Sequence, residues 1–134
     1  MTAIAEKYKN KPFPDFSSVI PMIPHMIFEK IDKDTIEKIY LFGSYAYGKP
    51  DENSDIDVCV IIKNEINRPE MQLKIKTILH DNKIVPSDIL VYNSNIFYDA
   101  LKLKNIERVI ANKGKILYGW KKIKQNRNRT FFVI

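Results

Sequence analysis

Cysteine and histidine are scarce in this 134-residue chain, which contains a single Cys and two His. One thiol, Cys59, cannot close an intramolecular disulfide and cannot build a cysteine-based zinc cluster. Two histidines argue against a His-rich metal site as well. A lone free cysteine is what a reducing compartment permits, so the sequence predicts a cytoplasmic protein.

Long apolar runs are also missing. The longest, residues 19–28, is interrupted by Pro21, Pro24 and His25, and it is half of the roughly 20 residues that span a bilayer. The polar first 16 residues have no apolar stretch of the kind found in signal peptides. We therefore expect a soluble protein without a membrane segment.

Acidic residues are absent from one part of the chain. The formal charge is +6, but residues 1–110 carry a net charge of −1, and residues 111–134 hold seven basic groups and no acidic one. This distribution argues against nucleic-acid binding by the whole protein and leaves only residues 121–129 as a candidate contact. A solvated basic tail is the commoner interpretation of such a run.

What is present indicates one domain, since 45% of the residues are apolar, enough for a real core. Hydrophobic periodicity and turn residues predict a mixed order of helices and strands. The expected helices are residues 17–31, delayed or bent by Pro24, and residues 69–80, 94–102 and 105–112, with one helical turn at 44–47. The expected strands are residues 38–42, 55–62, 88–92 and 115–118.

This order predicts an α/β or α+β fold: a small mixed sheet with helices packed on it. The β-branched run at 55–62 is typical of a strand covered on both faces. We divide the chain into an N-terminal arm and helix (1–34), a core (35–119) and a basic C-terminal tail (120–134).

Two acidic residues begin the strand expected at 55–62. Side chains alternate along a strand, so Asp55 and Asp57 are predicted to share a face, with Ile56 and Val58 on the other. Two carboxylates at the start of an apolar strand repel each other and lose hydration unless a cation compensates them. Oxygen ligands suit Mg²⁺, so the pair is a candidate metal site. The alternative is a pair of solvated acids at a strand end.

A glycine-containing turn comes shortly before this pair. Gly43 allows a ligand to approach the backbone closely, and the Ser44 hydroxyl with nearby N–H groups suits phosphate oxygens. Asp88 begins the next apolar strand, and if that strand neighbours residues 55–62, its carboxylate can join the site as a metal ligand or a base. Phosphate donors beside paired carboxylates indicate metal-assisted phosphoryl or nucleotidyl transfer.

The aromatic residues Tyr45 and Tyr47 flank the candidate phosphate turn. Their rings could stack on a nucleotide base or pack within the loop, and the sequence favours neither alternative. Cys59 lies on the Asp57 face but two residues deeper, which predicts a buried, inert thiol.

This pattern resembles the nucleotidyltransferase fold of the polymerase β superfamily, and in particular its minimal nucleotidyltransferase branch. The resemblance rests on Gly43-Ser44, which is followed after ten residues by Asp55-Ile56-Asp57 and later by Asp88. The resemblance implies that Gly43 and Ser44 hold the triphosphate of an NTP, ATP being the expected one. It implies that Asp55 and Asp57 bind two Mg²⁺ ions and that Asp88 is the third carboxylate of the catalytic and metal site.

The same resemblance implies a reaction in which a nucleoside monophosphate moves from an NTP to a hydroxyl with release of pyrophosphate. Many small members of the branch are antitoxins paired with a helical HEPN-domain toxin, and some adenylylate a tyrosine of that toxin. A HEPN-type partner protein is therefore expected.

Two other functions remain open. One is transfer to a small molecule such as an aminoglycoside, although only 46 residues follow Asp88 here, and such enzymes usually carry a sizeable second domain. The other is a non-catalytic module that works by covering a toxin.

Overall fold

The computed structural model describes residues 16–122 and 131–133, with side chains described for residues 16–119. The strands are β1 (Ile36–Phe42), β2 (Ile56–Ile62), β3 (Ser87–Asn93), β4 (Lys115–Tyr118), β5 (Trp120–Lys122) and β6 (Phe131–Val133). The α-helices are α2 (Ile23–Phe28), α3 (Ser44–Tyr47), α4 (Arg68–Asp81), α5 (Ser94–Ala100) and α6 (Ile106–Lys113). Three 3-10 turns are η1 (Phe16–Ser18), η2 (Ile20–Met22) and η3 (Lys33–Thr35).

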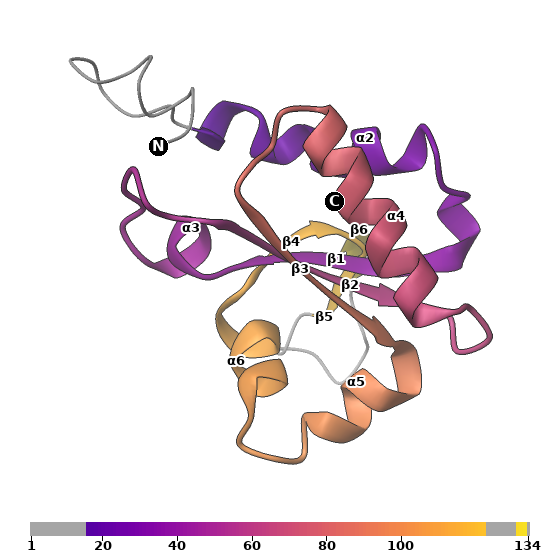
Figure 1. Cartoon of the computed structure of the whole chain (residues 1–134). Helices are drawn as coiled ribbons and strands as arrows, with labels where there is room; N and C mark the ends of the chain where they lie inside the picture. The colour runs from indigo at the N-terminus through magenta and orange to yellow at the C-terminus, as the bar shows by residue number, and fades with distance from the viewer. Residues whose placement is uncertain (1–15, 123–130, 134) are drawn as a thin grey trace.

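A four-stranded mixed sheet of order β3-β2-β1-β4 forms the centre of the molecule (Figure 1). β1 pairs antiparallel with both β2 and β4, while β2 and β3 are parallel. Helices α2 and α4 lie on one face of this sheet, and α5 and α6 lie on the other (Figure 1). The predicted mixed sheet with helices packed on it is therefore confirmed.

β2 contributes buried side chains to both hydrophobic clusters. Ile56, Val58, Val60 and Ile62 pack with α2 and α4, whereas Cys59 and Ile61 pack with Phe97 and Ile110 of α5 and α6. All six side chains have 0% exposure. This double burial explains the apolar, largely β-branched sequence from Val58 to Ile62, because neither face of this part of the strand meets water.

The N-terminal helix differs from the expected one. Residues 17–31 do not form a single helix: the chain makes the short turns η1 and η2 before α2 begins at Ile23. Pro24 lies in the first turn of α2, where a missing backbone N–H costs nothing. The delay predicted from Pro24 is confirmed, and the expected helix 17–31 is corrected to these three short segments.

The far end of the chain also contains a feature that periodicity did not predict. β5 and β6 pair antiparallel, Trp120 opposite Val133, in a separate two-stranded sheet. All of the expected polar arm at 1–16 except Phe16, and most of the basic run at 121–129, lie outside the described residues. The described helices include none long and apolar enough to cross a membrane.

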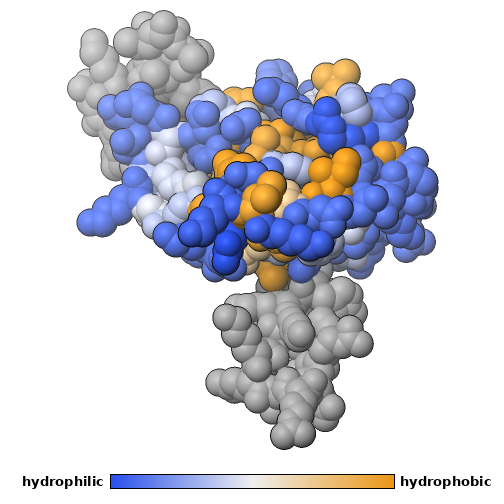
Figure 2. All heavy atoms as spheres, turned by 90° about the horizontal axis from the view of Figure 1, so that it is seen from below, coloured by the Kyte–Doolittle hydropathy of each residue, from blue (hydrophilic) through white to orange (hydrophobic). Residues whose placement is uncertain are grey.

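Exposed apolar side chains gather on the surface formed by α5, α6 and the loop between them, which faces the viewer in Figure 2. Ile96, Leu103, Ile106 and Val109 are each more than 40% exposed. The charged residues on this face include the pair Lys102 and Asp99, whose Nζ and Oδ1 lie 3.8 Å apart. This face is the opposite one from α2 and α4 (Figure 1).

Candidate functional site

The candidate phosphate turn joins the end of β1 to α3. Gly43 has φ +74°, a left-handed conformation that side-chain-bearing residues rarely adopt. Its carbonyl accepts hydrogen bonds from the backbone N–H groups of Ala46, at 2.9 Å, and Tyr47, at 3.1 Å. The helical turn predicted at residues 44–47 is confirmed, and Ser44 is its first residue.

Gly43 lies directly against the carboxylate of Asp57. A Cβ atom built on residue 43 would overlap Oδ2 of Asp57, so every other amino acid would displace either the turn or the carboxylate. Phe42, the last residue of β1, is the cross-strand partner of Asp57. The antiparallel pairing of β1 and β2 thus brings the glycine turn next to the acidic pair in space, although the two are separated by ten residues in the sequence.

Asp57 and Asp88 are direct neighbours on adjacent parallel strands. They are register partners in the β2–β3 ladder, which places their Cα atoms about 4.8 Å apart and their side chains on the same face of the sheet. The expectation that the strand of Asp88 neighbours that of Asp57 is confirmed. Asp57 is half-buried, and Asp88 is exposed.

Asp55 lies one residue before β2, so the strand expected at 55–62 begins one residue later, at Ile56. The Asp55 side chain is exposed. The backbone N–H of Ile56 donates to the carbonyl of Pro86 at 3.0 Å, which ties the start of β2 to the start of β3. The three acidic residues are therefore gathered at the same end of two neighbouring strands.

The electrostatics of this end are dominated by like charges. Burial, followed in size of effect by the nearby carboxylates of Asp88 and Asp55, raises the pKa of Asp57 from 3.8 to about 6. Each of these effects disfavours the ionised form. A bound cation would reverse this balance, because it favours the charged carboxylates that repel one another in its absence.

The donor set fits a hard divalent ion but does not form a complete cage. Within residues 16–122 and 131–133, no three or more His, Cys, Asp or Glu side chains stand in an arrangement that would hold a metal by themselves. Mg²⁺ is usually held by one or two carboxylates together with substrate phosphates and water, and seldom by protein ligands alone. The acidic strand ends are consistent with that mode of binding.

The structure decides between the two alternatives for Tyr45. The ring is only 8% exposed and belongs to the main hydrophobic cluster. It also meets Phe16 edge to face, with ring centroids 6.4 Å apart. Tyr45 is therefore a packing residue, whereas Tyr47, 46% exposed, remains accessible. Cys59 is fully buried as predicted.

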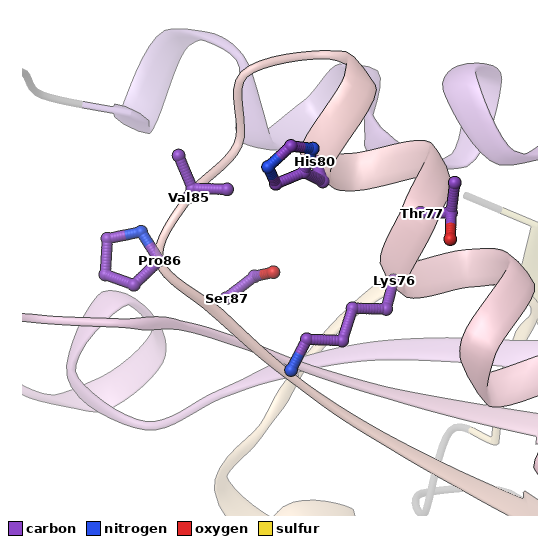
Figure 3. Close-up of a pocket in the computed structure, with 6 residues that line it drawn as sticks. All are labelled: Lys76, Thr77, His80, Val85, Pro86 and Ser87. Atoms are coloured by element: carbon purple, nitrogen blue, oxygen red, sulfur yellow. The ribbon is translucent and has the colours of Figure 1, made fainter.

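One cavity was not predicted from the sequence. A pocket of about 380 Å³ lies between α4 and the start of β3 and is lined by Lys76, Thr77, His80, Val85, Pro86 and Ser87 (Figure 3). Lys76 and His80 are four residues apart on α4 and so share one face of the helix. That spacing indicates from the sequence that the two basic side chains lie close together. The sequence does not indicate which strand this face of the helix packs against.

The fold and the family comparison define a nucleotidyltransferase domain. The chain belongs to the polymerase beta nucleotidyltransferase family, whose model matches residues 26–122. This range contains the β1–α3 turn and all three acidic residues of the candidate site.

A candidate protein adenylyltransferase of Methanocaldococcus jannaschii is 46% identical over 77 residues, which cover 58% of this chain and 75% of that protein. A crystal structure of a candidate nucleotidyltransferase from Sulfolobus solfataricus is 16% identical, with 84% of each chain covered and a TM-score of 0.44. A toxin–antitoxin crystal structure with AMP-PNP is 27% identical, covers 72% of this chain and 70% of its own, and has a TM-score of 0.44.

Proposed function

We propose that this protein is a metal-dependent adenylyltransferase that transfers AMP from ATP to a hydroxyl group of another protein. The observation that carries the proposal is the in-register pairing of Asp57 with Asp88 beside Gly43. Membership of the nucleotidyltransferase family and the printed name of the archaeal relative support the choice of reaction and nucleotide.

In this proposal the β1–α3 turn binds the triphosphate. Gly43 has no side chain, so phosphate oxygens can approach its backbone, and the Ser44 hydroxyl donates to one of them. Asp55 and Asp57 would hold two Mg²⁺ ions together with the phosphates, assisted by Asp88. Bound Mg²⁺ supplies charge neutralisation at the phosphates during transfer.

The transfer step uses the chain's own carboxylate as the base. The acceptor oxygen forms a bond to the α-phosphorus of ATP, and the bond from that phosphorus to the pyrophosphate oxygen breaks. The proton of the acceptor hydroxyl passes to Asp88, the most exposed strand position of the site. Products are an adenylylated hydroxyl and pyrophosphate, so atoms and charge balance without a further reactant.

A protein is the acceptor class that the archaeal relative's name supports. The sequence resemblance to minimal nucleotidyltransferases further suggests that the partner is a HEPN-type toxin, and this chain would then act as its antitoxin. The activity is proposed to reside in residues 35–119. Transfer to a small molecule and non-catalytic covering of a toxin are the competing outcomes of the experiments below.

Calorimetric titration of ATP in the presence of Mg²⁺ tests the proposal. We expect the wild-type protein to bind and the Asp57→Asn variant to bind more than about 100-fold more weakly, since even the outer partners of metal ligands are worth 10–100-fold. Glu65→Gln is the matched control, because Glu65 is an exposed acid just beyond the opposite end of β2. Equal binding by wild type and Asp57→Asn would contradict the proposed site.

A further inference from the structure

The strand that carries Asp88 is at the edge of the sheet. β3 pairs with β2 on one side, and the described strands include none on its other side. Figure 1 shows β3 at the front of the sheet, with α4 above it and α5 below it. Asp88, the proposed base, is the second residue of this edge strand.

The backbone groups of β3 that point away from β2 can be identified from two hydrogen bonds. The Pro86 carbonyl accepts from Ile56 on the β2 side, at 3.0 Å, whereas the Ile89 carbonyl accepts from the side-chain amide of Gln72 on α4, at 3.1 Å. Since backbone direction alternates along a strand, Ile89 and Val91 present their N–H and C=O groups outward. Gln72 occupies one of these groups, and the described residues supply no partner for the others.

The pocket in Figure 3 lies beside the same edge, between α4 and the start of β3. Ser87 lines the pocket, and its neighbour Asp88 faces the opposite way, toward Asp57. None of the ion pairs among the described residues involves Lys76, whereas Nδ1 of His80, one turn further along α4, lies 3.9 Å from Oδ1 of Asp81. A carboxylate is the group that this unpaired cation would attract.

We propose that the acceptor protein binds as an extended segment along the outer edge of β3. Its hydroxyl-bearing residue lies beside Asp88, and an acidic residue next to it enters the Lys76 pocket. Side chains of an added strand alternate between the two faces of the sheet, so a residue facing Asp57 and Asp88 has neighbours that face α4. This inference rests on the proposed adenylyltransferase function and adds how the acceptor is recognised.

Synthetic peptides with a central tyrosine, serine or threonine provide the test. Each is made with glutamate, alanine or lysine on both sides of the hydroxyl residue and is incubated with α-labelled ATP and Mg²⁺. We expect the glutamate-flanked peptides to be labelled about fivefold faster than the alanine-flanked ones. Lys76→Glu should reverse the preference, whereas Lys74→Glu, an exposed change on α4 outside the pocket, should not. Equal labelling of all three peptides would contradict the pocket.

Backbone pairing is tested separately by methylating one peptide amide at a time. If the peptide adds to β3, methylation should slow labelling about tenfold or more at alternate residues and leave the residues between them unaffected. Labelling that ignores methylation would overturn edge pairing. If the protein labels none of the peptides but still binds Mg²⁺ and ATP through Asp57, this inference alone is overturned. Loss of that nucleotide binding would overturn the proposed function as well.

Discussion

Asp57 and Ile61 lie on the same face of β2, four residues apart, in very different surroundings. Ile61 has 0% exposure and packs with Phe97 and Ile110. Asp57 is half-buried against Gly43, with Asp88 as its register partner. Between them, Cys59 is buried, and this burial raises the pKa of its thiol and keeps it protonated. The comparison indicates that the interior of the strand provides stability and that its start provides the candidate chemistry.

The largest effect should come from Gly43→Ala, at the start of this comparison. The new methyl group would overlap the Asp57 carboxylate. It would also be held at φ +74° and ψ −158°, a region open essentially to glycine alone, at a cost of about 1–3 kcal/mol. We expect AMP transfer to fall by about 100-fold or more, because displacing reacting groups by about 1 Å is enough for such a loss. Label transfer and thermal unfolding should be measured together.

Gly48→Ala is the control for that substitution. Gly48 ends the same turn but has φ −122°, so alanine fits its backbone conformation. The new Cβ would lie 3.0 Å from Cα of Ser44, which is a tight contact with the turn but does not touch Asp57. A Gly43→Ala protein that transfers AMP as fast as the wild type would show that the contact with Asp57 has no catalytic importance.

The interior of the strand should respond in the opposite way. Ile61→Ala leaves a cavity in the cluster formed with α5 and α6, and we expect the free energy of unfolding to fall by about 2–5 kcal/mol. Well below the melting temperature, the affinity for Mg²⁺ and ATP should change by less than about twofold, because a substitution rarely affects a site with which it is not in contact. Denaturant unfolding and calorimetry on the same samples measure both. Loss of nucleotide binding by a fully folded variant would contradict the assignment of stability to the interior of β2 and of binding to its start.

The pH dependence of metal binding tests whether the carboxylate of Asp57, at the start of β2, is a metal ligand. Its pKa of about 6 means that a proton competes with the cation below this pH. We expect Mg²⁺ affinity, measured by calorimetry without nucleotide, to fall about tenfold per pH unit below 6 and to level off above it. In Asp57→Asn this dependence should disappear. A pH-independent affinity in the wild type would exclude Asp57 as a metal ligand.

The stability of the metal-free protein should vary with pH in the reverse sense. The folded state holds the Asp57 proton more tightly than the unfolded chain, in which the pKa is 3.8. The contribution of this residue to the free energy of unfolding therefore decreases as pH rises from 3.8 to about 6, and is constant above that range. Comparing urea unfolding of wild type and Asp57→Asn across this range isolates the effect, and parallel curves would contradict it.

The smallest effect should come from removing residues 120–134. The proposed site lies within residues 35–119, so we expect binding of Mg²⁺ and ATP to remain within about twofold of the full chain, as for other removals of terminal segments outside a site. Calorimetry of both proteins checks this expectation. Loss of binding in a truncated protein that remains folded would make the C-terminal segment part of the site.

Much of the fold follows from short-range sequence signals. The β-branched run of β2 and the glycine after β1 placed those elements within one or two residues, because both patterns have a local physical cause. That β3 neighbours β2 is only a condition at the level of the sequence, and the parallel direction of the pair is not predicted, since no local signal fixes which strands become neighbours. It is this pairing that brings Asp88 to Asp57.

Other features could not be predicted because they depend on tertiary contacts. The short turn that contains Tyr45 has no periodicity that would indicate which of its side chains are buried, and the burial of this ring depends on tertiary contacts such as that with Phe16. Asn93 is the N-cap residue of α5, but its side chain makes no capping bond. Its amide instead donates to the carbonyls of Lys63 and Ile66, at 3.0 and 2.9 Å. The pairing of β5 with β6 joins segments that have no matching periodicity.

The central claim is that the joined starts of β2 and β3, beside the β1–α3 turn, bind nucleotide and metal. The most direct measurement is an NMR titration of the isotope-labelled full chain with Mg²⁺ and a non-hydrolysable ATP analogue. We predict that the backbone amide signals of Gly43, Asp57 and Asp88 shift together, while those of Ile62 and Asn93, at the opposite ends of β2 and β3, do not. Shifts confined to the opposite ends of the strands, or none at all, would contradict the account.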